Sequence, residues 1–334
     1  ALARARRTAA IQKWQSAELR NAKTNVRLFT SEGVDFRSPG SGFSSSDVLR
    51  VARRTIARIL GNPLFSDVLN LGTFTSGASQ GFTRSPDAIA AKFKAAATVT
   101  EPCIKRFLHV VEECETWALY RHWPLFYEPK EVVGGGLFTV PKNSEIDRCA
   151  IKEPDLNMYC QKGIGNYIRS RLRQQVGIDL NDQSRNQKLA RVGSVDGSLA
   201  TLDLSSASDL ISTQLVRMLL PEAWFDLLDD CRSQAVVVDG ETIELDMFSS
   251  MGNGFTFELE SMMFFALANA VAYLTGTRGT ISVYGDDIIV PTCMAGMLIK
   301  VLQWFGFKVN SKKSFYSGPF RESCGKHWYG GVDV

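Results

Sequence analysis

Residues 283–290 read Val283-Tyr-Gly-Asp-Asp-Ile-Ile-Val290, and this short stretch decides the fold. Apolar residues on both sides of Gly285-Asp286-Asp287 predict two strands joined by a tight turn. Gly-Asp is ordinary turn chemistry, so the tripeptide alone identifies no function. Two adjacent carboxylates, however, repel each other unless a cation lies between them. The hairpin therefore predicts a metal site at its tip.

A third carboxylate, Asp203, stands at the end of an apolar run that predicts a buried strand over residues 199–204. A charged group there is costly unless it is paired or bound to a metal. Three carboxylates at strand ends can hold two hard cations such as Mg²⁺, which clamp the attacking and leaving oxygens of a phosphoryl transfer. Residues 205–220 are predicted as a helix, with Ser206 and Asp209 in the spacing of a capping box.

Two further segments could bind phosphate groups. Residues 249–254 read Ser-Ser-Met-Gly-Asn-Gly and precede a long apolar helix predicted over residues 255–274. Glycines let a backbone approach a ligand closely, and a helix N-terminus favours a phosphate. A basic set near the short strand predicted at residues 137–140 could neutralise a triphosphate. That set comprises Lys142, Arg148 and Lys152. A capped loop and a solvated charged face are the ordinary structural alternatives.

The remaining pattern predicts an α+β chain. Turn signals place a hairpin over residues 235–245, with Asp239-Gly240 at its turn. Asp47 is predicted to cap a helix over residues 48–60 that ends at Gly61. A mostly helical stretch is expected over about residues 86–120, and further helices are expected at residues 157–175 and at about residues 295–305.

Composition agrees with a globular chain of about two domains. Of 334 residues, 45% are hydrophobic and 22% are charged, which excludes a disordered tail, a collagen-like repeat and a coiled coil. The longest apolar stretch, residues 262–274, is too short to span a bilayer. The seven cysteines include no CxxC pair, so we expect free thiols rather than a zinc ribbon or a redox dithiol.

The formal net charge of +3 conceals an asymmetry along the chain. Residues 1–60 contain 12 basic and 4 acidic residues, whereas residues 195–334 contain 9 basic and 17 acidic residues. This pattern suggests a basic N-terminal part that attracts polyanions and an acidic C-terminal part that holds cations. Scattered solvated charge is the alternative explanation.

Four motifs occur in one order: a basic loop, Asp-x5-Asp, a Gly-rich loop with its helix, and Tyr-Gly-Asp-Asp. That order resembles viral RNA-dependent RNA polymerases. Longer collinear stretches, from about residue 62 to residue 334, resemble the replicase catalytic subunit of the small single-stranded RNA bacteriophages, the leviviruses. These stretches are Gly177-Ile-Asp-Leu-Asn-Asp-Gln183, Asp203-Leu-Ser-Ser-Ala-Ser-Asp209, Ser250-Met-Gly-Asn-Gly-Phe-Thr-Phe-Glu-Leu-Glu-Ser261 and Gly318-Pro-Phe-Arg-Glu-Ser-Cys-Gly325.

The resemblance implies a right-hand polymerase with fingers and a palm, in which an antiparallel palm sheet packs on helices. Residues 1–60 would form a basic helical region, residues 61–194 mostly fingers with a basic nucleotide-entry loop, and residues 195–334 mostly palm. A hairpin at about residues 231–247 would reach toward the fingers, and residues 320–329 would grip the nascent 3′ end. The family continues into a helical thumb that is largely absent here, so we expect a fragment of a longer replicase.

The resemblance also implies roles for individual residues. Asp203, Asp286 and Asp287 would hold two Mg²⁺ ions, or Mn²⁺ ions in their place. Lys313 would protonate the leaving pyrophosphate, with Lys312 as the alternative acid.

The implied nucleotide site is larger. Asp209 and Asn253 would sense the ribose 2′-hydroxyl, and the basic set would face the triphosphate. The residues expected to bind the nucleotide are Lys142, Arg148, Lys152, Asp209, Ser250, Gly252 and Asn253.

By this resemblance the chain is an enzyme, an RNA-directed RNA polymerase that copies a viral single-stranded RNA genome by two-metal chemistry. It would use ribonucleoside triphosphates and release pyrophosphate. The implied partners are template and nascent RNA, the host translation elongation factors Tu and Ts, and a small-subunit ribosomal protein. The implied location is the cytoplasm of the infected bacterial host, without membrane insertion.

Three other interpretations stay open. A reverse transcriptase shares the palm and an aspartate pair, but contacts from Asp209 and Asn253 to a 2′-hydroxyl would argue against it. A serine hydrolase is suggested by Gly77-Ala-Ser-Gln-Gly81, a nucleophile-elbow pattern that Arg84-Ser-Pro86 interrupts before a helix can follow. A non-catalytic RNA-binding protein would use the basic N-terminal residues, but it leaves the three metal-site carboxylates without a purpose.

Overall fold

The computed structural model describes residues 2–38, 41–94, 97–113, 115–117, 129–143 and 145–334. The chain divides into two compact units, each built from three separate segments. Unit 1 comprises Ala1–Leu19, Asn62–Tyr167 and Glu222–Thr256. Unit 2 comprises Arg20–Gly61, Ile168–Pro221 and Phe257–Val334. Because the chain passes repeatedly from one unit to the other, neither unit is a continuous piece of sequence.

A four-stranded sheet belongs to unit 1. Its strands, in spatial order, are β6 (Asp147–Lys152), β5 (Gly135–Pro141), β8 (Ala235–Val238) and β9 (Glu241–Glu244). β5 pairs antiparallel with β6 and parallel with β8, and β8 and β9 form the predicted hairpin. Asp239 and Gly240 at its turn have φ values of 49° and 91°, and a two-residue turn with two positive φ angles matches the twist of the flanking strands.

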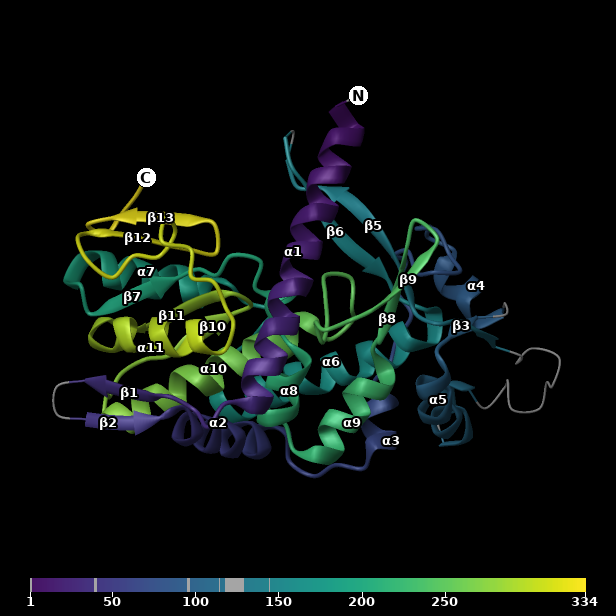
Figure 1. Ribbon diagram of the computed structural model, residues 1–334, viewed down its shortest axis with the longest axis horizontal. Coiled ribbons are helices and arrows are strands. Elements are labelled where there is room, and N and C mark those ends of the chain that lie inside the picture. The colour runs from purple at the N-terminus through teal and green to yellow at the C-terminus, as the bar shows by residue number, and fades with distance from the viewer. Residues whose placement is uncertain (1, 39–40, 95–96, 114, 118–128, 144) are drawn as a thin grey trace. The chain divides into compact units, whose positions relative to one another are not determined.

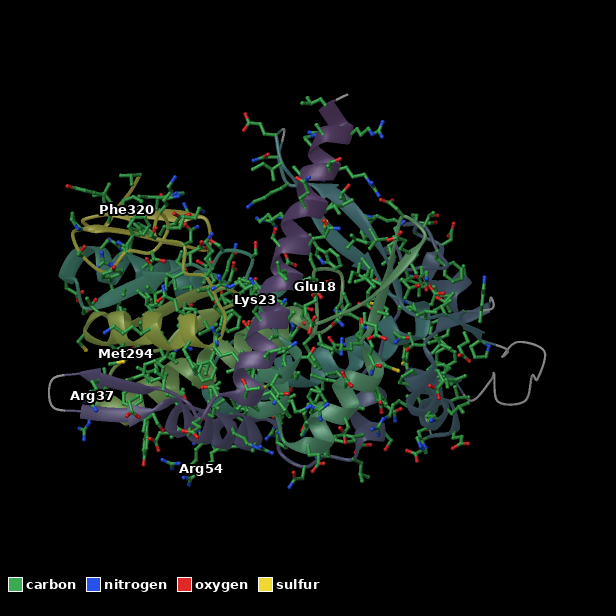
Figure 2. The ribbon with its side chains drawn as sticks, viewed as in Figure 1. Glu18, Lys23, Arg37, Arg54, Met294 and Phe320 are labelled. Atoms are coloured by element: carbon green, nitrogen blue, oxygen red, sulfur yellow. The ribbon has the colours of Figure 1, made fainter. Side chains whose placement is uncertain are left out.

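The first part of α1 (Leu2–Thr30) packs on this sheet. Trp14 lies in one apolar cluster with Met247 and with residues of β6 and β8. Glu18, labelled in Figure 2, accepts hydrogen bonds from the backbone N–H groups of Asp246 and Met247 at 2.8 and 2.9 Å. These contacts make the first part of α1 a component of the unit 1 core.

The remaining helices of unit 1 include those of the helical stretch predicted over residues 86–120. They are α3 (Phe65–Leu69), α4 (Ala88–Lys94), α5 (Glu101–Glu113), the short η1 (Glu115–Trp117), the first part of α6 (Asp155–Val176) and α9 (Glu222–Cys231). The mostly helical stretch predicted over about residues 86–120 is confirmed by α4, α5 and η1. It is not continuous, because strand β3 (Thr98–Val99) separates α4 from α5 and pairs with β4 (Lys130–Glu131). The β-branched Thr98 donates its N–H to the Asp155 carboxylate at 2.8 Å instead of to a helix carbonyl. Residues 118–120 of that prediction lie outside the described residues.

An antiparallel sheet of three strands belongs to unit 2 (Figure 1). Its spatial order is β10 (Ser282–Tyr284), β11 (Asp287–Pro291) and β7 (Leu199–Leu202). Tyr284 pairs with Asp287 across the hairpin, and Leu202 pairs with Ile288 on the other side of β11. The predicted strand and hairpin therefore lie side by side in one sheet.

Several helices belong to unit 2. They are α2 (Ser45–Leu60), α7 (Ser184–Asp196), the short η3 (Ser208–Leu210), α8 (Thr213–Leu219), α10 (Thr256–Thr275) and α11 (Thr292–Trp304), with the ends of α1 and α6. α11 packs on β7 and β11, and its Met294, labelled in Figure 2, is 1% exposed. The helices predicted at residues 157–175, 255–274 and 295–305 are confirmed by α6, α10 and α11.

Two small sheets complete unit 2. One is the hairpin of β1 (Asp35–Ser38) and β2 (Ser41–Ser44), and the other contains β12 (Phe320–Ser323), β13 (Lys326–Tyr329) and β14 (Val332–Asp333). Phe320, labelled in Figure 2, pairs with Tyr329 at the open end of the β12–β13 hairpin. The fully buried guanidinium of Arg321 donates to the carbonyls of Leu199 and Gly318 at 2.7 and 2.8 Å, so it ties this hairpin to β7.

The single helix predicted over residues 205–220 is wrong. Leu204 forms a β-bridge with Val309, and Ser206 has a left-handed φ of 56°, so the backbone there cannot enter a helix. The helical part is split into η3 and α8, and Ser212 caps α8 by accepting the N–H of Leu215. The predicted capping box of Ser206 and Asp209 therefore does not form.

The cap of α2 also differs from the prediction. Ser44 is the N-cap, and its hydroxyl accepts the N–H of Asp47 at 3.1 Å. The Asp47 carboxylate accepts the N–H of Ser44 in return, at 3.0 Å, which makes a reciprocal capping box. Asp47 is thus the third residue of the helix, three positions after the cap, and the helix ends at Gly61 as predicted.

One helix among the described residues, α10, is long and apolar enough to cross a membrane by length and composition. It is longer than the apolar run of residues 262–274, because polar residues at its start also join the helix. Within its apolar window 78% of the residues are buried, which is the burial of a core helix.

Candidate active site

The register of the unit 2 sheet brings the predicted carboxylates together. Because Leu202 pairs with Ile288 in an antiparallel ladder, the next residues along, Asp203 and Asp287, lie at the same end of the sheet. Asp286 occupies the turn between β10 and β11 at that end. The mutual repulsion of Asp203 and Asp287 contributes to the raised pKa of Asp203.

Helix α10 supports the turn that carries Asp286. The Ser261 hydroxyl, fully buried on α10, accepts the N–H of Gly285 at 2.9 Å. Gly285 has a φ of 60°, and a Cβ there would lie 2.6 Å from the Phe257 ring. Only glycine satisfies both the left-handed backbone and the close approach of α10, so the glycine of the motif has a structural cause.

A loop on the other side of β7 orients Asp203. The Asn310 side chain donates to the Asp203 carboxylate at 2.7 Å, and the Ser314 hydroxyl accepts the N–H of Asp203 at 3.1 Å. Burial raises the pKa of Asp203 above its ordinary value, although the Asn310 hydrogen bond and the nearby Lys313 ammonium lower it. The carboxylate is oriented but carries negative charge that its protein surroundings do not fully compensate.

Asp287 is held by the neighbouring β12–β13 hairpin. Its carboxylate accepts hydrogen bonds from the Ser323 hydroxyl and the Cys324 N–H, both at 3.1 Å. Burial raises the pKa of Asp287, and the hydrogen bonds from Cys324 and Ser323 oppose that shift. On the backbone side, the Asn186 side chain of α7 donates to the Asp287 carbonyl at 3.1 Å.

The candidate acid Lys313 lies beside these carboxylates. Its ammonium group donates to the Glu322 carboxylate of β12 at 2.9 Å, and this hydrogen bond raises the pKa of Lys313. The charges of Asp203 and Asp287 raise it further. Lys312 is exposed, and no comparable contact distinguishes it among the described residues. The structure therefore favours Lys313 over Lys312 as the lysine nearest the carboxylates.

Glu260 is a member of this acidic group that the sequence interpretation did not single out. It projects from α10, is 7% exposed, and its carboxyl lies 3.1 Å from the position a Cβ of Gly285 would take. Burial raises its pKa well above the ordinary value, and the charges of Asp286 and Asp209 raise it further. A glutamate inside an otherwise apolar helix was the signal that could have identified it.

The carboxylate oxygens of Asp203, Asp286 and Asp287 do not all lie close to one another. Among the described residues, the one group of three metal-binding side chains whose ligand atoms all lie within 4.8 Å consists of cysteines in unit 1. Asp203, Asp286 and Asp287 share one end of the sheet but do not form such a group.

The predicted basic set lies in unit 1, mainly on β6. Arg148 and Lys152 are four residues apart on this strand and therefore point to the same face. The Lys152 ammonium lies 5.2 Å from the centre of the Phe138 ring on β5. Lys142 is exposed just after β5, and its N–H donates to the Ile146 carbonyl at 2.8 Å.

The Gly-rich loop of residues 249–254 packs against β6. The Met251 carbonyl accepts the N–H of Ile151 at 2.9 Å, and a Cβ at Gly252 would lie 2.2 Å from the Ile151 carbonyl oxygen. A Cβ at Gly254 would lie 2.9 Å from Gln161. Close packing against the protein itself accounts for both glycines. Ligand binding at this loop stays a prediction. Ser250 is 3% exposed, and its carbonyl accepts the Thr256 hydroxyl at 3.0 Å.

Asn253 retains an unused donor. Its side-chain oxygen accepts the N–H of Phe255 at 2.9 Å, which orients the amide. Its amide nitrogen Nδ2 is buried and has no hydrogen-bond partner among the described residues. A buried donor without a partner is costly, so this atom is suited to a hydroxyl or carbonyl group of a ligand.

The nucleophile-elbow interpretation fails on geometry. Ser79 is 2% exposed, whereas an elbow presents its serine to solvent. The next helix, α4, begins only at Ala88. The serine hydrolase hypothesis is therefore rejected.

Comparison with solved structures defines the class of fold. The chain is similar to the RNA polymerase complex inside a double-stranded-RNA virus, with a TM-score of 0.51 and 11% identity, over 90% of this chain and 30% of that chain. The architecture is thus that of viral RNA polymerases, in agreement with an acidic hairpin at the end of an antiparallel sheet.

The particular family follows from sequence. A family model described as RNA replicase, beta-chain, matches residues 2–334, and this chain belongs to that family. It is 49% identical to the RNA-directed RNA polymerase beta chain of Escherichia phage MS2 over 98% of this chain and 59% of that protein. It is 46% identical to the same-named chain of Enterobacteria phage fr, with the same coverage. The chain therefore spans a little over half the length of these relatives.

Proposed function

We propose that this chain carries the catalytic core of an RNA-directed RNA polymerase that replicates a viral single-stranded RNA genome. It would join ribonucleoside triphosphates on an RNA template and release pyrophosphate. The observation that carries the proposal is the convergence of Asp203, Asp286 and Asp287 at one end of the unit 2 sheet. Membership of the RNA replicase beta-chain family supports the same activity.

The donor set of this acidic group fits two divalent cations, Mg²⁺ or Mn²⁺. Asp203, Asp286 and Asp287 would hold them, since carboxylate oxygens are the ligands that these hard ions prefer. The raised pKa values of Asp203 and Asp287 indicate negative charge that a cation would compensate. When bound, the ions would activate the 3′-hydroxyl and neutralise the charge on the leaving pyrophosphate.

The side chains around the carboxylates would orient and protonate the reacting groups. Asn310 keeps the Asp203 carboxylate in one orientation, and Ser323 does the same for Asp287. Lys313, protonated beside Glu322, would give a proton to the leaving pyrophosphate.

The predicted nucleotide-binding residues would keep the roles that the resemblance implies. Lys142, Arg148 and Lys152 would neutralise the triphosphate, because two of them share one face of β6. Asp209 and Asn253 would contact the ribose 2′-hydroxyl, and the unused Nδ2 donor of Asn253 supports this role. Ser250 and Gly252, in the same loop as Asn253, would bind the nucleotide with it. The contacts of Asp209 and Asn253 with the 2′-hydroxyl would distinguish this enzyme from a reverse transcriptase.

We assign unit 2 to the palm and unit 1 to the fingers of a right-hand polymerase. The antiparallel sheet with the acidic hairpin supports the palm assignment, and the β12–β13 hairpin beside it would grip the nascent 3′ end. The basic strand β6 and the β8–β9 hairpin, both in unit 1, support the fingers assignment.

The word beta in the names of the relatives implies further subunits. We propose that these are the host translation elongation factors Tu and Ts and a small-subunit ribosomal protein, as the resemblance to levivirus replicases implies. The complex would act in the cytoplasm of the infected bacterium. Co-purification of the chain with these three proteins from infected cells would test this.

The decisive test of the activity is labelled ribonucleotide incorporation on a primed RNA template with Mg²⁺. It is made with this chain and with a chain extended to the length of its relatives. We expect Asp286→Asn to lower incorporation by about a hundredfold or more, because the proposed site for two divalent cations loses one of its three carboxylates. Asp226→Asn, an exposed carboxylate on α9, is the matched control and should leave incorporation unchanged.

The possible outcomes distinguish the polymerase hypothesis from the reverse transcriptase and RNA-binding hypotheses. Synthesis that survives Asp286→Asn would contradict the assigned site, and preference for deoxyribonucleotides would indicate a reverse transcriptase. No synthesis in either form, with intact folding and added host factors, would favour a non-catalytic RNA-binding protein.

A further inference from the structure

Three cysteines that are far apart in the sequence meet in the interior of unit 1. Cys103 lies on α5, Cys160 on α6, and Cys231 at the end of α9. All three side chains are fully buried. Their sulfur atoms all lie within 4.8 Å of one another. Three thiols from three different helices therefore surround one point.

Hydrogen bonds connect α6 to the other two helices next to these thiols. Asn157, one turn before Cys160, exchanges hydrogen bonds with Thr100 at the start of α5, at 3.0 and 2.7 Å. The Asn157 amide also donates to the backbone carbonyl of Cys231 at 3.1 Å. Gln161, the neighbour of Cys160, donates to the same carbonyl at 2.9 Å.

An ion pair connects the remaining two helices. Arg106, one turn after Cys103 on α5, pairs with Asp230, the neighbour of Cys231 on α9, at 2.9 Å. Each pair of the three helices is thus joined within one turn of its cysteines. Such outer contacts hold ligands in place before a cation binds, which is the arrangement found around protein metal sites.

We propose that Cys103, Cys160 and Cys231 form a binding site for one soft, thiophilic divalent cation of the Zn²⁺ and Cd²⁺ class. Sulfur ligands select such ions, whereas the hard Mg²⁺ of the carboxylate site prefers oxygen. A divalent ion that displaces two thiol protons leaves the buried site neutral, and the third sulfur would coordinate as a neutral thiol. The site would join three helices of unit 1 and is independent of the proposed polymerase activity.

The alternative is that the three cysteines only fill space, since a buried free cysteine behaves as a small apolar side chain. The two explanations differ in one measurable property. A packed cluster has no affinity for a cation, whereas a cation that binds the folded chain alone raises its melting temperature.

Titration of the full chain with Cd²⁺ alone tests the proposal. Thiolate-to-cadmium absorption in the ultraviolet should saturate at one ion per chain, and the melting temperature should rise. Cys160→Ser and Cys160→Ala should both lose the absorption and the rise. Cys293→Ser, which removes an exposed thiol on α11, should retain both.

The outcomes are distinct even if a variant folds poorly. X-ray absorption of the cadmium-loaded wild-type chain should show three sulfur ligands, and one sulfur or none would overturn the proposal. Saturation that persists in both Cys160 variants, or that disappears in Cys293→Ser, would also overturn it, because the ion would then be bound by other thiols. Ribonucleotide incorporation enters none of these measurements, so failure of the polymerase proposal would leave them unaffected.

Discussion

Asp203 shows how a single residue can lower stability for the sake of a site. It ends a strand whose four residues are buried, and it lies near a second carboxylate, Asp287. Burial raises the pKa of Asp203, so the folded state binds its proton more tightly than the unfolded state does. Ionisation of Asp203 therefore lowers stability as the pH rises above the ordinary value of 3.8.

We predict that Asp203→Asn raises the urea midpoint at neutral pH without divalent ions, because it removes a buried charge while the amide oxygen can still accept from Asn310. The same change should abolish incorporation. Urea unfolding at neutral and acid pH measures the effect. The gain should disappear at acid pH, where Asp203 is protonated in the wild-type protein, and a midpoint that falls at neutral pH would contradict the argument.

The two adjacent lysines differ in their surroundings, which leads to a second prediction. Lys313 pairs with Glu322, and the charges of Asp203 and Asp287 help to raise its pKa, whereas Lys312 has no such ion pair among the described residues. Lys313→Ala should lower the rate of incorporation about a hundredfold, as expected for loss of a general acid. Lys312→Ala is the matched control and should stay within a few-fold of wild type. Single-turnover incorporation measures both, and equal effects would remove the assignment of Lys313.

At the scale of an element, the start of α2 shows why local patterns identify a helix more reliably than its first residue. The spacing of Ser44 and Asp47 is that of a capping box. Each of the two can cap a helix, and the choice depends on where the preceding hairpin ends. β2 runs to Ser44, so the helix begins one residue later and Asp47 becomes the reciprocal partner.

We predict that Ser44→Ala lowers the free energy of unfolding by about 1 kcal/mol through loss of this cap. The measurement is urea unfolding followed by circular dichroism, with Ser46→Ala, an exposed serine in the same turn, as the control. The Ser44 N–H and the Arg50 side chain lower the pKa of Asp47 to about 2. The stabilisation by ionised Asp47 is therefore complete above its ordinary value of 3.8 and is lost as the pH falls toward 2. A Ser44→Ala effect no larger than that of Ser46→Ala would refute the cap.

At the scale of the whole molecule, the basic N-terminal part and the acidic C-terminal part of the sequence do not coincide with the two units. Residues 1–19 belong to unit 1 and residues 20–61 to unit 2. Several of the N-terminal arginines also have structural contacts. Arg7 pairs with Asp239 in unit 1, and Arg20 donates to the Gly306 carbonyl in unit 2 at 2.8 Å. Part of the basic character is thus used to build the fold.

The last prediction concerns the division between folding and activity. The cores of both units consist of apolar side chains, so the fold does not depend on hard cations. Omission of Mg²⁺ should abolish incorporation while leaving the circular dichroism spectrum unchanged, and Mn²⁺ should restore synthesis. Incorporation that continues without any divalent ion would contradict the two-ion proposal, and loss of the spectrum would show that the ions are structural.

Much of the fold and of the acidic site follows from local sequence. Short apolar runs and turn residues predict β10, β11 and the β8–β9 hairpin, because strand and turn preferences act over a few residues. Asp286 and Asp287 are neighbours in the chain, so their proximity needs no tertiary structure. Asp203 is identified by its chemistry, since a carboxylate after a buried strand requires a partner.

Other features depend on contacts between distant segments. The interruption at Thr98, the left-handed Ser206 and the packing of Gly252 on Ile151 are set by strands that pair from elsewhere in the chain. The meeting of Cys103, Cys160 and Cys231 has no sequence signature, because no short spacing links them. Side-chain type and local periodicity are properties of the sequence, whereas the neighbours of each side chain are decided only when distant segments pack.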